Sequence, residues 1–370
     1  MIAGQSNQWA PAPGKVGPWG QLESSRVFIE PPRDFVLPAF TVPQPLRWEF
    51  RGYTSEKLEA LWQEAKLTDT QRATLNDPRH RTTESTGIVI APPHDLVLEL
   101  TAETRAILYG ALAAFPENAI HRDPFRSRTE FVDSWLDDPA LAPEVAALTR
   151  RLLYRRKNSV LLSDHDLILP LIPTTGERID FLKTLSRKSA IFVQVHVAPN
   201  TDIDTMADYW GSGRRSKDLK PLLHSLAQRP QGGSIDIVHL LPPLPRQLLY
   251  TYPTPTGRES DHNRDCHWTS LNFYQPQADD RLANTEFALQ TLLNNYRRVD
   301  DTPRLGDIVM LVEGGGNGIH SCVYIADNIV FTKNGSSYSV PWLLARLEDV
   351  VSFYSLNAQL ETRRYRLKTL

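Results

Sequence analysis

One cysteine, placed where a helix is expected to begin, most constrains how this chain folds. Cys266 begins an amphipathic run, and His320, further along the chain, begins a β-rich run. The unpaired N–H groups and the positive dipole end of a helix N-terminus lower the pKa of a thiol and make its sulfur reactive. A cysteine followed by a histidine in this order predicts a thiol nucleophile and its base.

The segment between these two residues predicts a small sheet. Residues 305–312 predict a buried strand entered by a tight glycine turn, and the glycine-rich residues 314–318 predict a second turn before His320. We expect an α+β fold in which strands near 305–311, 319–325 and 329–333 form an antiparallel sheet. The Cys266 helix would pack on that sheet, with His320 on the same side as Cys266.

On these residues the C-terminal part resembles the NlpC-type cysteine peptidases, a papain-like family that cuts peptidoglycan stem peptides. The matching positions are Asp265-Cys266, Gly306-Asp307-Ile308-Val309, and His320 with Tyr324 four residues on. The resemblance covers residues 248–354. It implies a papain-like fold, a cysteine peptidase or amidase acting on a peptide or cell-wall peptidoglycan fragment, and an extracytoplasmic location, periplasmic or secreted.

The resemblance also assigns roles to individual side chains. Cys266 would attack an amide carbonyl, and His320 would take and return the proton. The backbone N–H of Cys266 would stabilise the oxyanion, with Tyr252 as a second donor. No cofactor and no metal ion are implied. A zinc site of His262, Cys266, His320 and Cys322 is an alternative, although its spacing departs from the compact zinc patterns.

The third catalytic residue departs from the family pattern. The family's Phe-x-His aligns with residues 331–333 and ends on Lys333, and a protonated lysine cannot accept the imidazole N–H. Asn334 can accept it. A three-residue hairpin loop at residues 326–328 would place Asn334 opposite His320, whereas a two-residue loop would turn it to the other face.

A second departure favours another function. Bulky His267 and Trp268 replace the small Ser-Gly pair that follows the family's cysteine, so they would narrow the substrate cleft. One alternative is therefore a catalytically inactive or redirected papain-like module that binds a cell-wall or peptide ligand. In that module His267 and Trp268 would fill the groove.

Length predicts more than one domain. The 370 residues exceed the usual size of one domain. We expect an extended Pro/Gly-rich arm at residues 1–45, a mixed, mostly helical domain at 46–232 and the papain-like domain at 233–370. Helices are expected to begin near Thr54, Thr101 and Pro143.

Charge and hydropathy exclude several partners. The net charge is −2 and the sequence pI is near 6.6, so nothing predicts a nucleic-acid surface. No apolar stretch approaches the length of a membrane span, and residues 1–5 do not resemble a signal peptide. Two cysteines are too few for a disulfide framework. The oligomeric state is left open.

Overall fold

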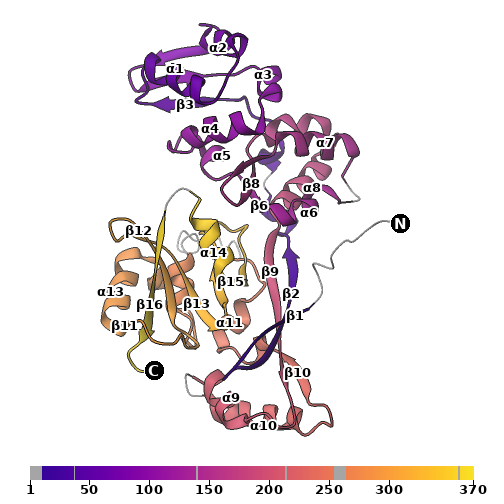
Figure 1. The fold of residues 1–370 in the computed structure, drawn as a ribbon, viewed down its shortest axis with the longest axis vertical. Coiled ribbons are helices and arrows are strands. Elements are labelled where there is room, and N and C mark those ends of the chain that lie inside the picture. Colours follow the sequence, from indigo (N-terminus) through magenta and orange to yellow (C-terminus); the bar gives the residue numbers. More distant parts are fainter. Residues whose placement is uncertain (1–10, 37, 139–140, 213–214, 254–263, 357–358) are drawn as a thin grey trace. The chain divides into compact units, whose positions relative to one another are not determined.

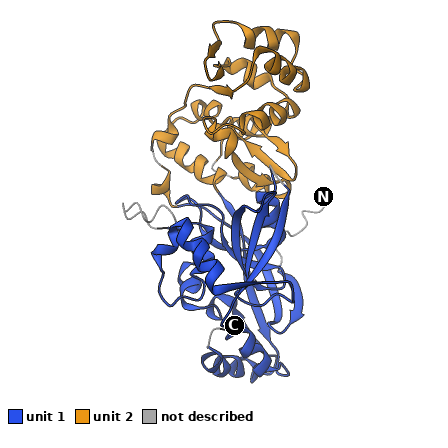
Figure 2. Ribbon diagram, turned by 90° about the vertical axis from the view of Figure 1, so that its left-hand side faces the viewer, with its two compact units in different colours: residues 1–31, 187–370 blue, residues 32–186 orange. Residues whose placement is uncertain are grey.

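The computed structural model describes residues 11–36, 38–138, 141–212, 215–253, 264–356 and 359–370. The chain divides into two compact units, which Figure 2 draws in separate colours. Unit 1 comprises residues 1–31 and 187–370, and unit 2 comprises residues 32–186. Helices and antiparallel sheets occur in both units, which confirms the expected α+β class.

The first sheet of unit 1 corrects the predicted domain boundaries. β2 (Gly20–Ile29) pairs antiparallel with β9 (Lys188–Val197) along its whole length. Residues 12–29, predicted as an arm outside any core, therefore belong to the same unit as the C-terminal sheet, and Leu22 is buried in its core. The predicted boundaries at residues 45 and 232 were wrong because they assumed that each unit is continuous in sequence.

This sheet has the strand order β1-β2-β9-β10, and its elements are labelled in Figure 1. Helices α9 and α10 follow β9 and pack against it through Met206, Leu219 and Leu223. The other elements around the sheet are β1 (Ala12–Gly17), α9 (Ile203–Trp210), α10 (Ser216–Ala227), β10 (Gly233–Asp236), η6 (Ile237–His239) and α11 (Pro243–Leu248).

The second sheet of unit 1 contains the three strands expected from the sequence. Its strand order is β11-β16-β12-β13-β14-β15, with antiparallel pairing throughout. The strands are β11 (Tyr296–Val299), β12 (Ile308–Glu313), β13 (Gly318–Ala326), β14 (Ile329–Lys333), β15 (Trp342–Arg346) and β16 (Leu360–Leu367). Gly306, with φ 87°, makes the tight turn before β12, and the Tyr274 hydroxyl occupies the space that a Cβ would need.

Helices cover both faces of this six-stranded sheet. One face packs with α12 (Cys266–Leu271), η8 (Asp280–Ala283) and α13 (Thr285–Asn295), and the other with α14 (Leu347–Tyr354). Ile308 and Met310 of β12 belong to the first core, whereas Val309 and Leu311 belong to the second. Burial of both faces explains why the central strands read as unbroken apolar runs.

Unit 2 combines helices with two three-stranded sheets of order β3-β5-β4 and β6-β8-β7. Thr54 and Thr101 cap helices and Pro143 begins one, as predicted. The strands are β3 (Trp48–Arg51), β4 (Arg81–Glu84), β5 (Gly87–Ile90), β6 (Phe125–Arg128), β7 (Tyr154–Arg156) and β8 (Ser159–Leu162). The helices are α1 (Ser55–Glu64), α2 (Asp69–Asn76), α3 (His94–Glu99), α4 (Ala102–Leu112), α5 (Ala119–Arg122), α6 (Asp133–Leu136), α7 (Pro143–Leu152) and α8 (Thr175–Leu185). The 3-10 turns are η1 (Arg33–Phe35), η2 (Pro38–Thr41), η3 (Thr129–Phe131), η4 (His165–Leu167) and η5 (Leu169–Leu171).

Candidate functional site

Helix α12 begins at Cys266 because Asp265 caps it. The Asp265 carboxylate accepts hydrogen bonds from the backbone N–H groups of His267 and Trp268, both at 2.9 Å. The helix then packs on β13 through Ser321, whose hydroxyl donates to the Cys266 carbonyl at 3.1 Å and lies 3.0 Å from Ser270 Oγ. Ser321 is therefore the β13 residue that faces the start of α12.

His320 lies on the opposite face of β13. Successive side chains of a strand point to opposite faces, so His320 turns away from α12 when Ser321 turns toward it. The His320 ring stacks on Tyr354 of α14, with 4.1 Å between ring centroids. Leu311, its partner on β12, belongs to the core on the α14 side. Cys266 and His320 are thus separated by the sheet, and the same-side arrangement predicted from the sequence was wrong.

The environment of Cys266 also differs from that of a catalytic thiol. Burial, with a smaller effect of the neighbouring Asp265 charge, raises the pKa of Cys266 to about 12. Backbone N–H groups at the start of α12 and at Ser321 act in the opposite direction, and burial outweighs them. The helix N-terminus alone predicted a lowered thiol pKa, and that prediction ignored the cost of burying a thiolate.

We therefore expect iodoacetamide to label Cys266 in the folded protein about a thousandfold more slowly at pH 8 than it labels a peptide thiol of ordinary pKa. Cys322, fully buried with its pKa also raised by burial, should label as slowly. Mass spectrometry across a pH series measures both rates. Rapid labelling of Cys266 that slows in His320→Gln would contradict the separation of the two residues.

Asn334 reaches His320 only through Thr332. His320 Nε2 lies 3.0 Å from Thr332 Oγ1, which donates to Asn334 Oδ1 at 3.0 Å. Burial, together with His267, lowers the pKa of His320 to about 3. His320 is thus a buried neutral imidazole, and Asn334 lies at the end of its hydrogen-bond chain.

The hairpin register arises differently from the prediction. Asp327 and Asn328 form a two-residue loop between the paired residues Ala326 and Ile329, not the expected three-residue loop. A bulge between Tyr324 and Ala326 supplies the missing residue. The pairing of Val323 with Phe331 therefore has the register that the three-residue loop would have given.

Of the three remaining predicted residues, one lines a cavity and two do not. His267 lines the cavity described below. Trp268 is fully buried against Trp342, so it belongs to the core and not to a groove. Tyr252 is half-buried, and its pKa is raised by burial and by Glu30 at the end of β2. Tyr252 does not line the cavity.

Lys333 is the unexpected buried cation of the α12 face. Its ammonium group donates to the carbonyls of Gly335 at 2.6 Å and Ser337 at 3.1 Å, and it lies 5.9 Å from the centre of the Trp342 ring. Burial lowers the pKa of Lys333 to about 8, while Asp265 and Cys266 act to raise it. The alternation of β14 could have placed Lys333 on this face once that of β13 was known.

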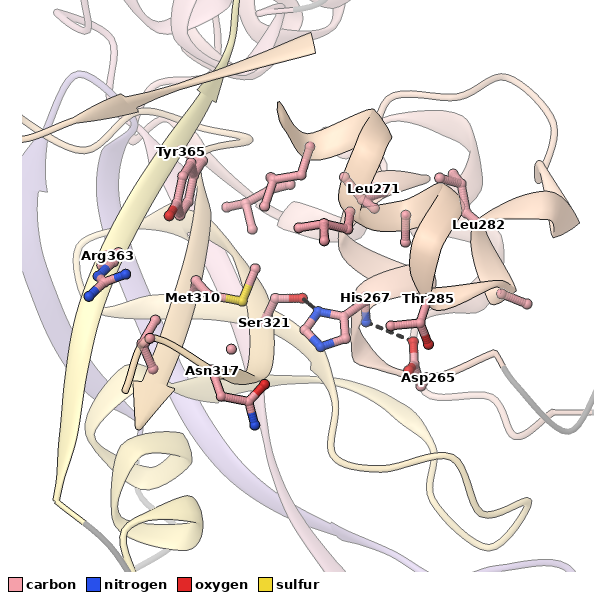
Figure 3. Close-up of a pocket in the computed structure, with 18 residues that line it drawn as sticks. Asp265, His267, Leu271, Leu282, Thr285, Met310, Asn317, Ser321, Arg363 and Tyr365 are labelled. Atoms are coloured by element: carbon pink, nitrogen blue, oxygen red, sulfur yellow. Dashed lines mark hydrogen bonds between the residues drawn. The ribbon is translucent and has the colours of Figure 1, made fainter. Parts of the chain in front are cut away.

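A cavity of about 290 Å³ lies between α12, α13 and strands β12, β13 and β16. Its wall is mostly apolar, with residues such as Leu271, Ala288 and Met310. Figure 3 shows the Ser321 hydroxyl hydrogen-bonded to the His267 ring, with Met310 and Asn317 beside them. Ser321 Oγ and His267 Nδ1 are 3.0 Å apart.

Neighbouring groups compensate the charges of the ionisable side chains that line the cavity. Burial lowers the pKa of His267, although Asp265 opposes the shift, so the imidazole is neutral at neutral pH. Arg363 is paired with Glu361 at 2.7 Å. Among the described residues, no group of three or more His, Cys, Asp and Glu side chains could hold a metal ion. His262, part of the alternative zinc set, lies outside the described residues.

Comparisons with known proteins do not place the chain in a family. No protein-family model matches it, and neither a curated protein nor a solved structure matches it. Across the described residues, no helix is both long enough and apolar enough to cross a membrane.

Proposed function

We propose that unit 1 is a binding module that takes an apolar group of a peptide or peptidoglycan fragment into the cavity beside α12. One observation carries the proposal: the sheet separates Cys266 from His320, while the cavity opens beside His267 and Ser321. The kind of ligand follows from the resemblance to the NlpC-type peptidases.

Two properties of the separated residues favour binding over cleavage. A thiol nucleophile needs a base within hydrogen-bond reach. The sheet lies between His320 and Cys266, so His320 is not placed to act as that base. Cys266 is also buried and does not line the cavity, although Asp265 and His267 on either side of it do. A ligand in the cavity would therefore contact the His267 imidazole and the Ser321 hydroxyl, and not the Cys266 sulfur.

The cavity suits a ligand with an apolar part and polar atoms close to it. Aliphatic side chains of α13 and β12 would receive the apolar part, and each buried methylene contributes about 0.8 kcal/mol to such binding. Asn317 and Thr285 present hydrogen-bonding groups to the same cavity. Peptide bonds next to an apolar side chain have the complementary donors and acceptors.

Titration with purified peptidoglycan fragments tests the proposal when release of new amino groups is followed in parallel. We expect binding without release, and unchanged affinity in Cys266→Ser. Leu289→Glu should weaken binding at least about tenfold, because a carboxylate on the apolar rim loses hydration when the ligand enters.

Leu293→Glu is the matched control for this rim variant. Both leucines are exposed on α13, at 51% for Leu289 and 59% for Leu293, and only Leu289 of the two lines the cavity. Leu293→Glu should bind as the unchanged protein does. Amino-group release that is lost in Cys266→Ser would establish the hydrolase instead.

A further inference from the structure

We propose that the group bound in the cavity is an unbranched acyl chain of about ten carbons, carried in an uncharged amide or ester such as an acylated peptide. This inference deepens the binding proposed above and rests on it. The size of the cavity, the chemistry of its wall and the balance of its charges each support one part of it.

Size limits the chain length. The cavity of about 290 Å³ is about twice as large as an apolar cavity that holds the six carbons of benzene, so it accommodates about ten carbons. A smaller apolar cavity of about 150 Å³ is enough to bind benzene, so this one has room for a larger ligand than a single ring.

The wall favours a flexible chain over a planar ring. Leucine, isoleucine, valine, alanine and methionine side chains form half of it, and Tyr365 is the aromatic residue among the described lining residues. Planar ligands gain from stacking on aromatic faces, and a single tyrosine provides little such surface. Met310, with its flexible thioether, adapts to a chain of variable conformation.

The charges favour a neutral head group. Glu361 pairs with Arg363 through both of its carboxylate oxygens, at 2.9 and 2.7 Å. Lys333 lies within electrostatic range of Asp265, and the His267 ring is neutral. A carboxylate or ammonium head group would lose its hydration here without gaining an uncompensated counter-charge, which is costly.

Hydrogen-bonding groups remain for an amide or ester head. Asn317 and Thr285 line the same cavity, whereas the Ser321 hydroxyl is already engaged by the Cys266 carbonyl, Ser270 and His267. Hydroxyl and amide side chains pair with a carbonyl oxygen or an amide N–H without requiring a net charge.

Isothermal titration of the full chain with two ligand series tests the inference. In the first series the chain of a primary amide grows from hexanamide to dodecanamide, and we expect about fourfold tighter binding per added methylene until the cavity is full. In the second series decanamide is compared with decanoate and decylamine, and we expect at least about tenfold weaker binding of both charged ligands.

A cavity-filling variant distinguishes occupation from general surface binding. Ala288→Phe should move the preferred chain length to shorter amides, a change that loss of stability alone would not produce. Ala288 is buried on α13, so Ala283→Leu, at a half-buried lining position, serves if Ala288→Phe does not fold.

The outcomes separate this inference from the function on which it rests. Charged ligands that bind as tightly as decanamide, or affinity independent of chain length, would overturn it. If peptidoglycan fragments bind in a Leu289-dependent way and acyl amides do not, the inference fails and the binding module stands. If Leu289→Glu changes the binding of neither, both proposals fail.

Discussion

Arg366→Met is expected to lower the free energy of unfolding of unit 1 by about 3–5 kcal/mol. Arg366 on β16 forms a two-pronged ion pair with Asp307 at the entrance to β12, with N–O distances of 2.8 and 2.7 Å. Both side chains are almost fully buried. Methionine retains the apolar stem of the arginine but leaves the Asp307 carboxylate buried without its cation.

Two further variants test this explanation. Replacing both partners, as Asp307→Leu with Arg366→Met, should cost less than the sum of the single changes, because no buried charge is left unpaired. Arg363→Met removes the exposed pair with Glu361 on the same strand and should cost less than about 1 kcal/mol. Urea unfolding followed by fluorescence gives these values, with hydrogen exchange at β12 and β16 identifying the transition of unit 1. Equal costs for Arg363→Met and Arg366→Met would contradict the prediction.

Acid should destabilise unit 1 through His320. Its pKa falls from an ordinary 6.5 to about 3 in the folded protein because burial disfavours the charged ring. Below pH 6.5 the unfolded chain therefore binds a proton that the folded chain does not bind. Stability is fully present above pH 6.5 and falls by about 1.4 kcal/mol per pH unit down to about pH 3, a total of about 4–5 kcal/mol.

His320→Gln should remove this dependence, since glutamine does not titrate and its amide can still donate to Thr332. The measurement is the exchange rate of β13 and β14 amides between pH 4 and pH 7, corrected for intrinsic rates. His121→Gln is the matched control, because His121 is a buried histidine of unit 2 whose pKa is also lowered to about 3. An identical pH slope in His320→Gln and the unchanged protein would contradict the assignment.

The local elements of the C-terminal half could be predicted from the sequence. The helix at Cys266 and the strands at 308–313, 318–326 and 329–333 follow from short-range signals: apolar runs, glycine turns and hairpin chemistry. These signals act within a few residues, so they also located the helices that begin after Thr54 and Thr101.

The arrangement of the site could not be predicted in the same way. Whether His320 or Ser321 faces α12 is decided by one position of strand register, and both faces of this sheet are buried, so the hydrophobic pattern does not distinguish them. The bulge in the β13–β14 hairpin is a second one-residue effect of this kind. The pairing of β2 with β9 depends on residues far apart in the chain, which no local pattern encodes.

That same pairing gives unit 2 a particular place in the chain. Ile29 and Lys188 are paired at the last rung of the β2–β9 ladder, so the chain leaves unit 1 and returns to it at neighbouring points. Residues 32–186 thus occupy the position of a hairpin turn, and unit 2 is a whole folded unit inserted where a few loop residues would suffice. Because loop-closure entropy grows only slowly with loop length, the insertion costs unit 1 little folding free energy. Exchanging unit 2 for a short turn would therefore leave the register of the β2–β9 pair unchanged.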